Sequence, residues 1–309
     1  QIAIFHLFTH AFFKALLFLG SGSVIHAVSD EQDIRKMGDL YRLIPFTWIT
    51  MLIGTLALTG FPFMSGYFSK DGIIESAFVS HTSGHLYAFY LLIFSALLTS
   101  FYSWRLIFLT FHGKSKVSKD VLSKVHESPK VMMIPLMILS FCSIFSGYIF
   151  VDYFMSHDFE FLWKSAIYLS SDNHIIEEIH NVPLWVKYSP LVMMILGFVV
   201  SFLFYIVFPF APGKVSKTFN PLYKFLLNKW YFDEAYEFIF VRNIKKFGKF
   251  LSLTGDKKVI DGLGPDGISF RVLAIAKQVG RLQTGYVYHY AFAMLFGLTI
   301  FLSYFFIKG

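Results

Sequence analysis

Long apolar runs separated by shorter polar stretches dominate the pattern of this chain. Six runs are long enough to cross about 30 Å of hydrocarbon as helices, which takes roughly 20 residues each. The predicted spans cover residues 2–27, 46–66, 87–111, 131–154, 190–212 and 286–307. The pattern therefore predicts an all-α polytopic membrane protein.

The second apolar run continues into residues 72–80, which makes it too long for one straight span. Gly60, Pro62 and Gly66 lie in its middle, within the stretch GFPFMSGYFSKDG at 60–72. Irregular backbone at membrane depth is tolerated only where it is buried in protein or lines a watery cavity. We therefore expect one helix with a break near its centre.

A different pattern occupies residues 213–285. Aromatic and aliphatic residues alternate at helical spacing with Lys, Arg and acids over residues 223–255, which is typical of an amphipathic helix at a membrane surface. GDKKVIDGLGPDG at 255–267 is expected to interrupt it, and residues 268–282 resume the pattern. About fifty helical residues would span ~75 Å. That length favours a strap across neighbouring subunits over a helix that rests on lipid or on its own bundle.

Composition agrees with a membrane protein and excludes several other classes. The 309 residues are 55% hydrophobic and 15% charged, whereas about a quarter of the residues of a soluble domain are charged. Cys142 is the single cysteine, so the chain alone can build no disulfide framework, Cys-rich metal site or iron–sulfur site. Neither a phosphate-binding glycine loop nor a flavin or nicotinamide site is visible. Because Gln1 leads directly into an apolar run, we expect an upstream part of the protein to be missing.

Basic residues are distributed unequally between the connections. The connections 29–45, 112–130 and 213–285 hold 21 Lys and Arg, while the other connections and the tail hold three. The positive-inside rule places the first set in the cytoplasm, and both ends of the chain on the outer side. The net charge of +7 is thus a topology signal, and we expect no nucleic-acid partner.

Three basic residues remain inside the predicted spans, namely Lys14, Lys70 and Arg105. A charge at the bilayer centre costs about 2.5–3.5 kcal/mol, so each requires a reason. Arg105 lies near the cytoplasmic end of its span, where its side chain can reach the headgroups, and we interpret it as an anchor.

His6, His10 and Lys14 are spaced at i, i+4 and i+8, with Thr9 beside them. On a helix they form one polar stripe that rises about 12 Å. Imidazole titrates near neutrality, so the stripe suits a proton wire bridged by water. The alternative is that each group only hydrogen-bonds to a neighbouring helix, but three titratable groups in register favour the wire.

Lys70 and Asp71 are predicted to lie where the broken helix restarts, with Ser69 as its N-cap. Adjacent residues diverge by about 100° on a helix, so we expect only Lys70 to face the cavity and Asp71 to be an acid of the first turn. Glu75 is a weaker second acid. The alternative is that residues 69–71 form a surface turn at the membrane edge, and the pattern leaves both interpretations open.

Several long motifs resemble one family. HLFTHAFFKALLFLGSGSVIHA (6–27), EQDIRKMGDL (31–40) and LALTGFPFMSGYFSKDGIIE (56–75) resemble the second half of the antiporter-like L subunit family of respiratory complex I, also called NADH dehydrogenase subunit 5. NKWYFDEAYEFIFVR (228–242) resembles the C-terminal extension of that family. The resemblance covers essentially the whole chain.

The resemblance implies an antiporter-like bundle with a broken helix, a lateral helix and a terminal span. Residues 1–112 would hold the late part of the second antiporter-like repeat, 113–212 additional spans and an outer loop, 213–285 the lateral helix, and 286–309 the terminal span. It also implies functional residues: His6, His10 and Lys14 would belong to a central hydrophilic axis, and Lys70 with Asp71 to the outlet-side proton-transfer site.

The expected function is that of a proton-translocating, non-redox membrane-arm subunit of NADH:quinone oxidoreductase. Flavin, iron–sulfur clusters and quinone would be bound by other subunits, and the expected partners are neighbouring antiporter-like subunits and lipids. The bacterial inner membrane is the expected location, with the mitochondrial inner membrane as the alternative.

Two other functions remain open. One is the large subunit of a multi-subunit sodium/proton antiporter, against which NKWYFDE at 228–234 and the lateral helix argue. The other is a mainly structural clamp of the membrane arm. Retention of Lys14 and Lys70 argues against the clamp, since a vestigial stripe has no reason to bear their insertion cost.

Overall fold

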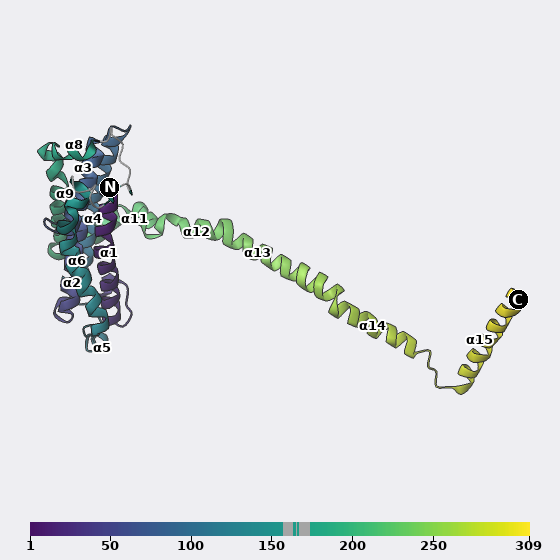
Figure 1. Ribbon diagram of the computed structural model, residues 1–309. Coiled ribbons are helices and arrows are strands. Elements are labelled where there is room, and N and C mark those ends of the chain that lie inside the picture. The colour runs from purple at the N-terminus through teal and green to yellow at the C-terminus, as the bar shows by residue number, and fades with distance from the viewer. Residues whose placement is uncertain (157–162, 165, 167–173) are drawn as a thin grey trace. The chain divides into compact units, whose positions relative to one another are not determined.

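The computed structural model describes residues 1–156, 163–164, 166 and 174–309 (Figure 1). These residues are mostly helical and contain no strand, which confirms the predicted all-α class. They divide into two units, Gln1–Thr218 and Phe219–Gly309. This division falls a few residues after the predicted start of the lateral segment. The predicted outer loop 155–189 lies in part outside the described residues.

The described part of the chain contains five helices that are long and apolar enough to cross a membrane. They are Ile2–Ala27 (α1), His85–His112 (α4 with a final π-helical turn), Lys130–Met155 (α6), Leu184–Val207 (α9, also with a final π-helical turn) and Val287–Lys308 (α15). The prediction starts the fifth span too late, at residue 190. The helix begins directly after Pro183 and continues through Pro190. Proline is tolerated inside helices that cross membranes.

The predicted second span is two shorter helices, which confirms the expected break. Pro45–Thr59 (α2) ends at Gly60, whose φ of 81° provides a left-handed C-cap, and Ser65–Val79 (α3) follows. The irregular backbone is shorter than predicted. Residues 65–72 are already helical, so the break is confined to residues 60–64.

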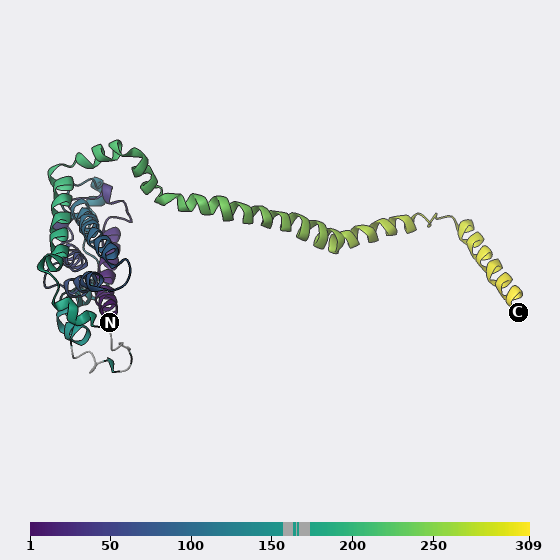
Figure 2. The same ribbon diagram turned by 90° about the horizontal axis from the view of Figure 1, so that it is seen from above.

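The first unit is a bundle in which α1 packs against α2, α3 and α6, while α4 pairs with α9 (Figure 1, Figure 2). Close approach of α4 and α9 depends on Gly197, since a Cβ there would lie 2.6 Å from the Leu97 carbonyl oxygen. Beside it, the Ser100 hydroxyl donates to the Met194 carbonyl at 2.6 Å.

Connections predicted to share one side of the membrane contact each other. Glu127 accepts hydrogen bonds from the backbone N–H of Phe46 at 2.6 Å and of Thr47 at 3.1 Å, so it caps the start of α2. The pair His81 and Glu178, 3.1 Å apart, joins the two connections that the charge pattern assigns to the opposite side. Both contacts agree with helices that cross in alternating directions.

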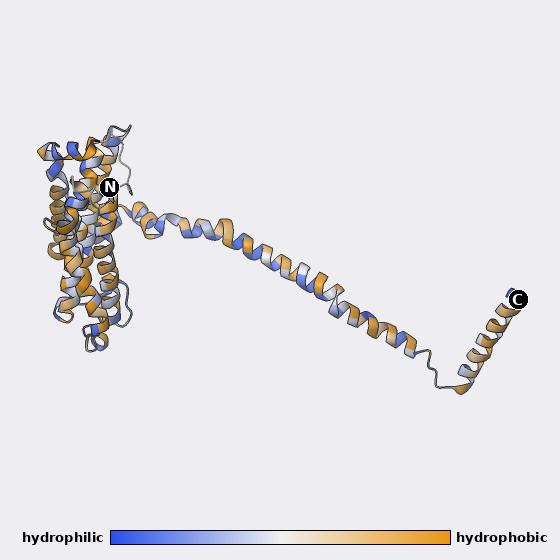
Figure 3. Ribbon diagram, in the orientation of Figure 1, coloured by the Kyte–Doolittle hydropathy of each residue, from blue (hydrophilic) through white to orange (hydrophobic). Residues whose placement is uncertain are grey.

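The second unit begins with Asn220–Leu227 (α11), Phe232–Tyr236 (α12) and Arg242–Phe250 (α13), and continues to Pro265–Gly280 (α14) and α15. Three successive left-handed residues, 229–231, bend the path between α11 and α12. The predicted interruption at residues 255–267 is partly wrong, because residues 251–261 keep a helical path with π-type winding. Hydrophilic and hydrophobic residues alternate from α11 to α14, whereas α15 is mostly hydrophobic (Figure 3).

Candidate functional site

A buried hydroxyl joins the histidines of α1 to the broken helix. The rings of His6 and His10 lie 5.7 Å apart between centroids. His6 Nδ1 lies 3.0 Å from Ser69 Oγ, and Thr9 Oγ1 lies 2.7 Å from the same oxygen. Thr9 and Ser69 are fully buried. Ser69 of α3 therefore connects the His6 side chain with the helix that carries Lys70.

Lys70 points back to the break between α2 and α3. Its ammonium donates to the carbonyl oxygen of Thr59, the last residue of α2, at 2.5 Å. Carbonyl groups at a helix C-terminus lack partners in the helix and carry a partial negative charge, so they stabilise a cation. Gly60 makes room for it, since a Cβ at this position would lie 2.6 Å from Lys70 Nζ.

Asp71 reaches the same break. Its side chain is buried, and Oδ1 would lie 3.8 Å from a Cβ at Gly60. The described residues supply no hydrogen-bond partner for this oxygen. The expectation that only Lys70 faces the break is wrong, because the long lysine side chain folds back to Gly60 beside the Asp71 carboxyl group.

Two further expectations for this stretch are corrected. Ser69 is no N-cap: α3 begins at Ser65 after Met64, so Ser69 and Asp71 lie in the second turn, and the Ser69 hydroxyl also lies within 3.3 Å of the Ser65 carbonyl oxygen. The surface-turn alternative is also wrong, because Ser69 and Asp71 are buried inside the bundle.

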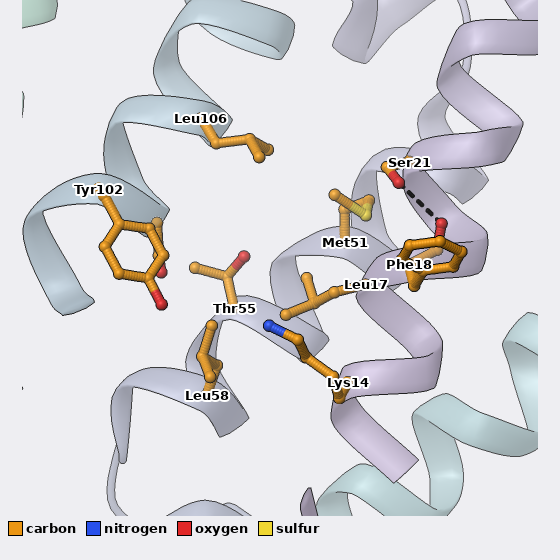
Figure 4. Close-up of a pocket in the computed structure, with 10 residues that line it drawn as sticks. Lys14, Leu17, Phe18, Ser21, Met51, Thr55, Leu58, Tyr102 and Leu106 are labelled. Carbon is orange, nitrogen blue, oxygen red and sulfur yellow. Dashed lines mark hydrogen bonds between the residues drawn. The ribbon is translucent and has the colours of Figure 1, made fainter. Parts of the chain in front are cut away.

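Lys14 has different surroundings. It lines a groove between α1, α2 and α4, where its ammonium points toward Thr55 and Leu58 while the Tyr102 hydroxyl enters from the opposite wall (Figure 4). The side chain is exposed in the described chain. Lys14 still interacts electrostatically with His10, and Lys70 does so with His6.

The structure therefore arranges the predicted residues as a row rather than a single stripe. The order along the row is Lys14, His10, His6, the Ser69 hydroxyl, Lys70 and Asp71. Arg105 lies outside this row, with its guanidinium 5.6 Å from the centre of the Tyr205 ring. Its anchor role stays a prediction.

Sequence reasoning named Ser69 and Gly60 but missed the contacts that they make in this site. Ser69 contacts a histidine 63 positions away, and nothing in the local pattern pairs them. Gly60 had a signal, since glycine after an apolar helix predicts its end, but its contact with Lys70 depends on how the two half-helices meet. Among the described residues, no group of three or more His, Cys, Asp or Glu side chains could hold a metal ion.

Two family models match different parts of the chain. Residues 1–102 match the family model described as NADH:quinone oxidoreductase/Mrp antiporter, TM, and residues 168–307 match that of the NADH dehydrogenase subunit 5 C-terminus. NADH-ubiquinone oxidoreductase chain 5 of Marchantia polymorpha is 44% identical, over 98% of this chain and 46% of that protein. This chain belongs to the subunit L and chain 5 family.

Bacterial members of the subunit L and chain 5 family match as well. NADH-quinone oxidoreductase subunit L of Rhodobacter capsulatus is 40% identical over 96% of this chain and 51% of its own length. Chain 5 of Arabidopsis thaliana is 42% identical over 99% of this chain and 46% of its own length. The chain thus spans about half the length of the curated relatives it matches, and the predicted resemblance is confirmed.

Proposed function

We propose that this chain forms part of a proton-translocating, non-redox membrane-arm subunit of NADH:quinone oxidoreductase. The names of its relatives support the complex. The observation that carries the proposal is the row of protonatable groups from Lys14 to Asp71 inside an apolar helix bundle. Ionisable groups within membrane spans are costly, and they mark ion or proton pathways.

Each group of the row can hold or pass a proton. Imidazole rings accept a proton on one nitrogen and release one from the other, and hydroxyl groups both donate and accept hydrogen bonds. The bonds of Ser69 to His6 and Thr9 therefore provide a route from α1 to α3. Internal water would complete the steps between groups that do not touch.

Lys70 is the group at which we propose that the proton changes sides. When neutral, it would accept a proton from the inner side through the histidines. When charged, its ammonium is held by the Thr59 carbonyl and faces Asp71. A new positive charge nearby would favour release of the proton toward the outer side, because like charges disfavour the protonated form.

The second unit supports a role in assembly as a second candidate function. None of the helices of residues 219–309 buries a residue within this unit, although their apolar side chains are many. We propose that residues 213–285 contact neighbouring antiporter-like subunits and lipid, in the inner membrane of a bacterium or a mitochondrion. Flavin, iron–sulfur clusters and quinone would be bound by the other subunits.

The test is proton pumping measured together with NADH oxidation in the reconstituted full complex that carries Lys70→Ala or Lys14→Ala. We expect pumping to be lost and oxidation to slow in an assembled complex. Lys116→Ala, an exposed lysine of the connection 112–130, is the matched control and should pump normally. Unchanged pumping in Lys70→Ala would show that the broken helix has only a structural role, and it would favour the structural clamp.

A further inference from the structure

The second half of α3 carries a buried acid that the row above does not use. Tyr67, Asp71 and Glu75 are spaced at i, i+4 and i+8, so they share one face of α3 and rise about 12 Å along it. Glu75 is only 9% exposed. Glutamate is almost never buried to this degree unless it is paired or functional.

Lys187 of α9 interacts electrostatically with this acid. The residues that precede Glu75 and Lys187 in sequence support the proximity of the two side chains. Ile74 and Val186 lie in one buried cluster with Phe89 and Ile93 of α4. The interface that holds Ile74 against Val186 therefore also brings Glu75 near Lys187.

The position of Lys187 marks the end of the buried region. Lys187 is exposed, and the aromatic residues beside it, Trp185 and Tyr188, are 54% and 53% exposed. Tryptophan and tyrosine are enriched where a membrane meets water. The same end of the bundle holds the His81 and Glu178 pair, which the charge pattern assigns to the outer side. The face of α3 that carries Asp71 and Glu75 thus extends from the break at Gly60 toward the outer surface.

We propose that Glu75 is a further proton-transfer group, which carries the proton from Asp71 to the outer surface beside Lys187. The inference rests on the proposed function. Neighbouring acids one turn apart on a helix are about 5–6 Å apart at Cβ, so one internal water can bridge them. The protonated Asp71 carboxyl gives its proton to the Glu75 carboxylate through that water. Glu75 then gives it to water at the surface, and the Lys187 ammonium stabilises the carboxylate that remains.

The competing explanation is a structural ion pair in which Glu75 and Lys187 hold α9 against α3. Both explanations predict some loss of stability when either partner is removed. They differ in the pumping ratio, defined as protons moved per NADH oxidised in complexes that have assembled. An ion pair alone would leave this ratio unchanged.

The experiment compares the full complex carrying Glu75→Gln, Glu75→Asp, Lys187→Gln or Lys70→Ala in sealed vesicles. We expect the pumping ratio of Glu75→Gln to fall to that of Lys70→Ala, and Glu75→Asp to restore it, since it keeps a titratable carboxyl. Lys187→Gln should retain part of the ratio. Glu178→Gln removes a half-buried carboxylate at the same end, which pairs with His81, and should leave the ratio unchanged.

Each outcome decides between the two proposals. A normal ratio in Glu75→Gln with a lost ratio in Lys70→Ala would overturn the role of Glu75 and leave the proposed function intact. Normal ratios in both variants would overturn the proposed function and this inference with it. If Glu75→Gln prevents assembly, the ratio in Lys187→Gln decides. A normal ratio there, equal to that in Glu75→Asp, would support the ion pair alone and overturn the role of Glu75, whereas a ratio below that in Glu75→Asp would support proton transfer through Glu75.

Discussion

The helix bundle buries polar side chains along with apolar ones, whereas the C-terminal segment, residues 219–309, exposes its apolar side chains. In the bundle, polar side chains such as Thr9, Ser69 and Asp71 are buried between apolar helices. In residues 219–309, large apolar side chains such as Phe247 are exposed, and no residue of this unit is buried within the unit itself. A buried polar group must be satisfied by the protein itself, whereas an exposed apolar surface needs lipid or a partner.

This difference predicts that substitutions in the two regions affect different properties of the complex. Substitutions in the bundle act on groups whose partners are in the same chain, so they should change proton transfer in an assembled complex. Substitutions on the apolar side of the segment affect side chains that the segment itself does not bury, so they should act on assembly. The following predictions test this separation, from the largest expected effect to the smallest.

The largest effect is expected from Phe247→Glu in α13. Phe247 is 61% exposed and lies on the apolar side of an amphipathic helix. A carboxylate placed at a contact with lipid or a partner lacks compensation, so the amount of assembled complex should fall strongly. The measurement is the yield of intact complex on a native gel. Lys245→Glu, on the opposite side of the helix, should assemble, and equal yields would contradict an assembly role for this apolar side.

Gly60→Ala should abolish most proton pumping without loss of assembly. The new Cβ would lie 2.6 Å from Nζ and 2.9 Å from Cε of Lys70, and the φ of 81° disfavours alanine by about 1–2 kcal/mol. The ammonium must therefore leave the Thr59 carbonyl. Gly22→Ala is the matched control, since a Cβ there meets no atom within 4 Å. Normal pumping in Gly60→Ala would show that the placement of Lys70 at the break is not required.

Ser69→Ala should reduce the pumping ratio less than Lys70→Ala does. The substitution removes the oxygen that contacts both His6 and Thr9, but water can occupy part of the space and restore a slower route. Ser140→Ala is the control, because that buried hydroxyl donates only within its own helix, to the Leu136 carbonyl. Equal pumping ratios in the two variants would exclude Ser69 from the row.

Glu127→Ala should give the smallest effect and act on stability alone. The loss of its hydrogen bonds to the first N–H groups of α2 should cost about 1 kcal/mol, as for other N-terminal caps. The temperature of half-inactivation of the complex should fall by a few degrees, with an unchanged pumping ratio. Asp120→Ala, an exposed acid of the same connection, should leave that temperature unchanged. A lower pumping ratio in Glu127→Ala would place this connection in proton transfer as well.

The sequence by itself determined the features that depend on local pattern. Runs of about 20 apolar residues fix the spans, because each backbone group in lipid must be satisfied within the helix. Gly60 and Pro62 mark the break for the same reason, and the spacing of His6, His10 and Lys14 fixes their order along α1. The amphipathic pattern of residues 223–255 likewise predicts a helix with one apolar side.

Only the tertiary structure decided which of these groups meet. Ser69 reaches His6, and Lys70 folds back to Thr59, because α3 packs against α1 and follows α2 through a short turn. Lys14 faces a groove toward α4 instead, although its spacing from His10 equals that between the histidines. Helical spacing gives the direction of a side chain from its own axis, whereas its partners depend on how the helices pack.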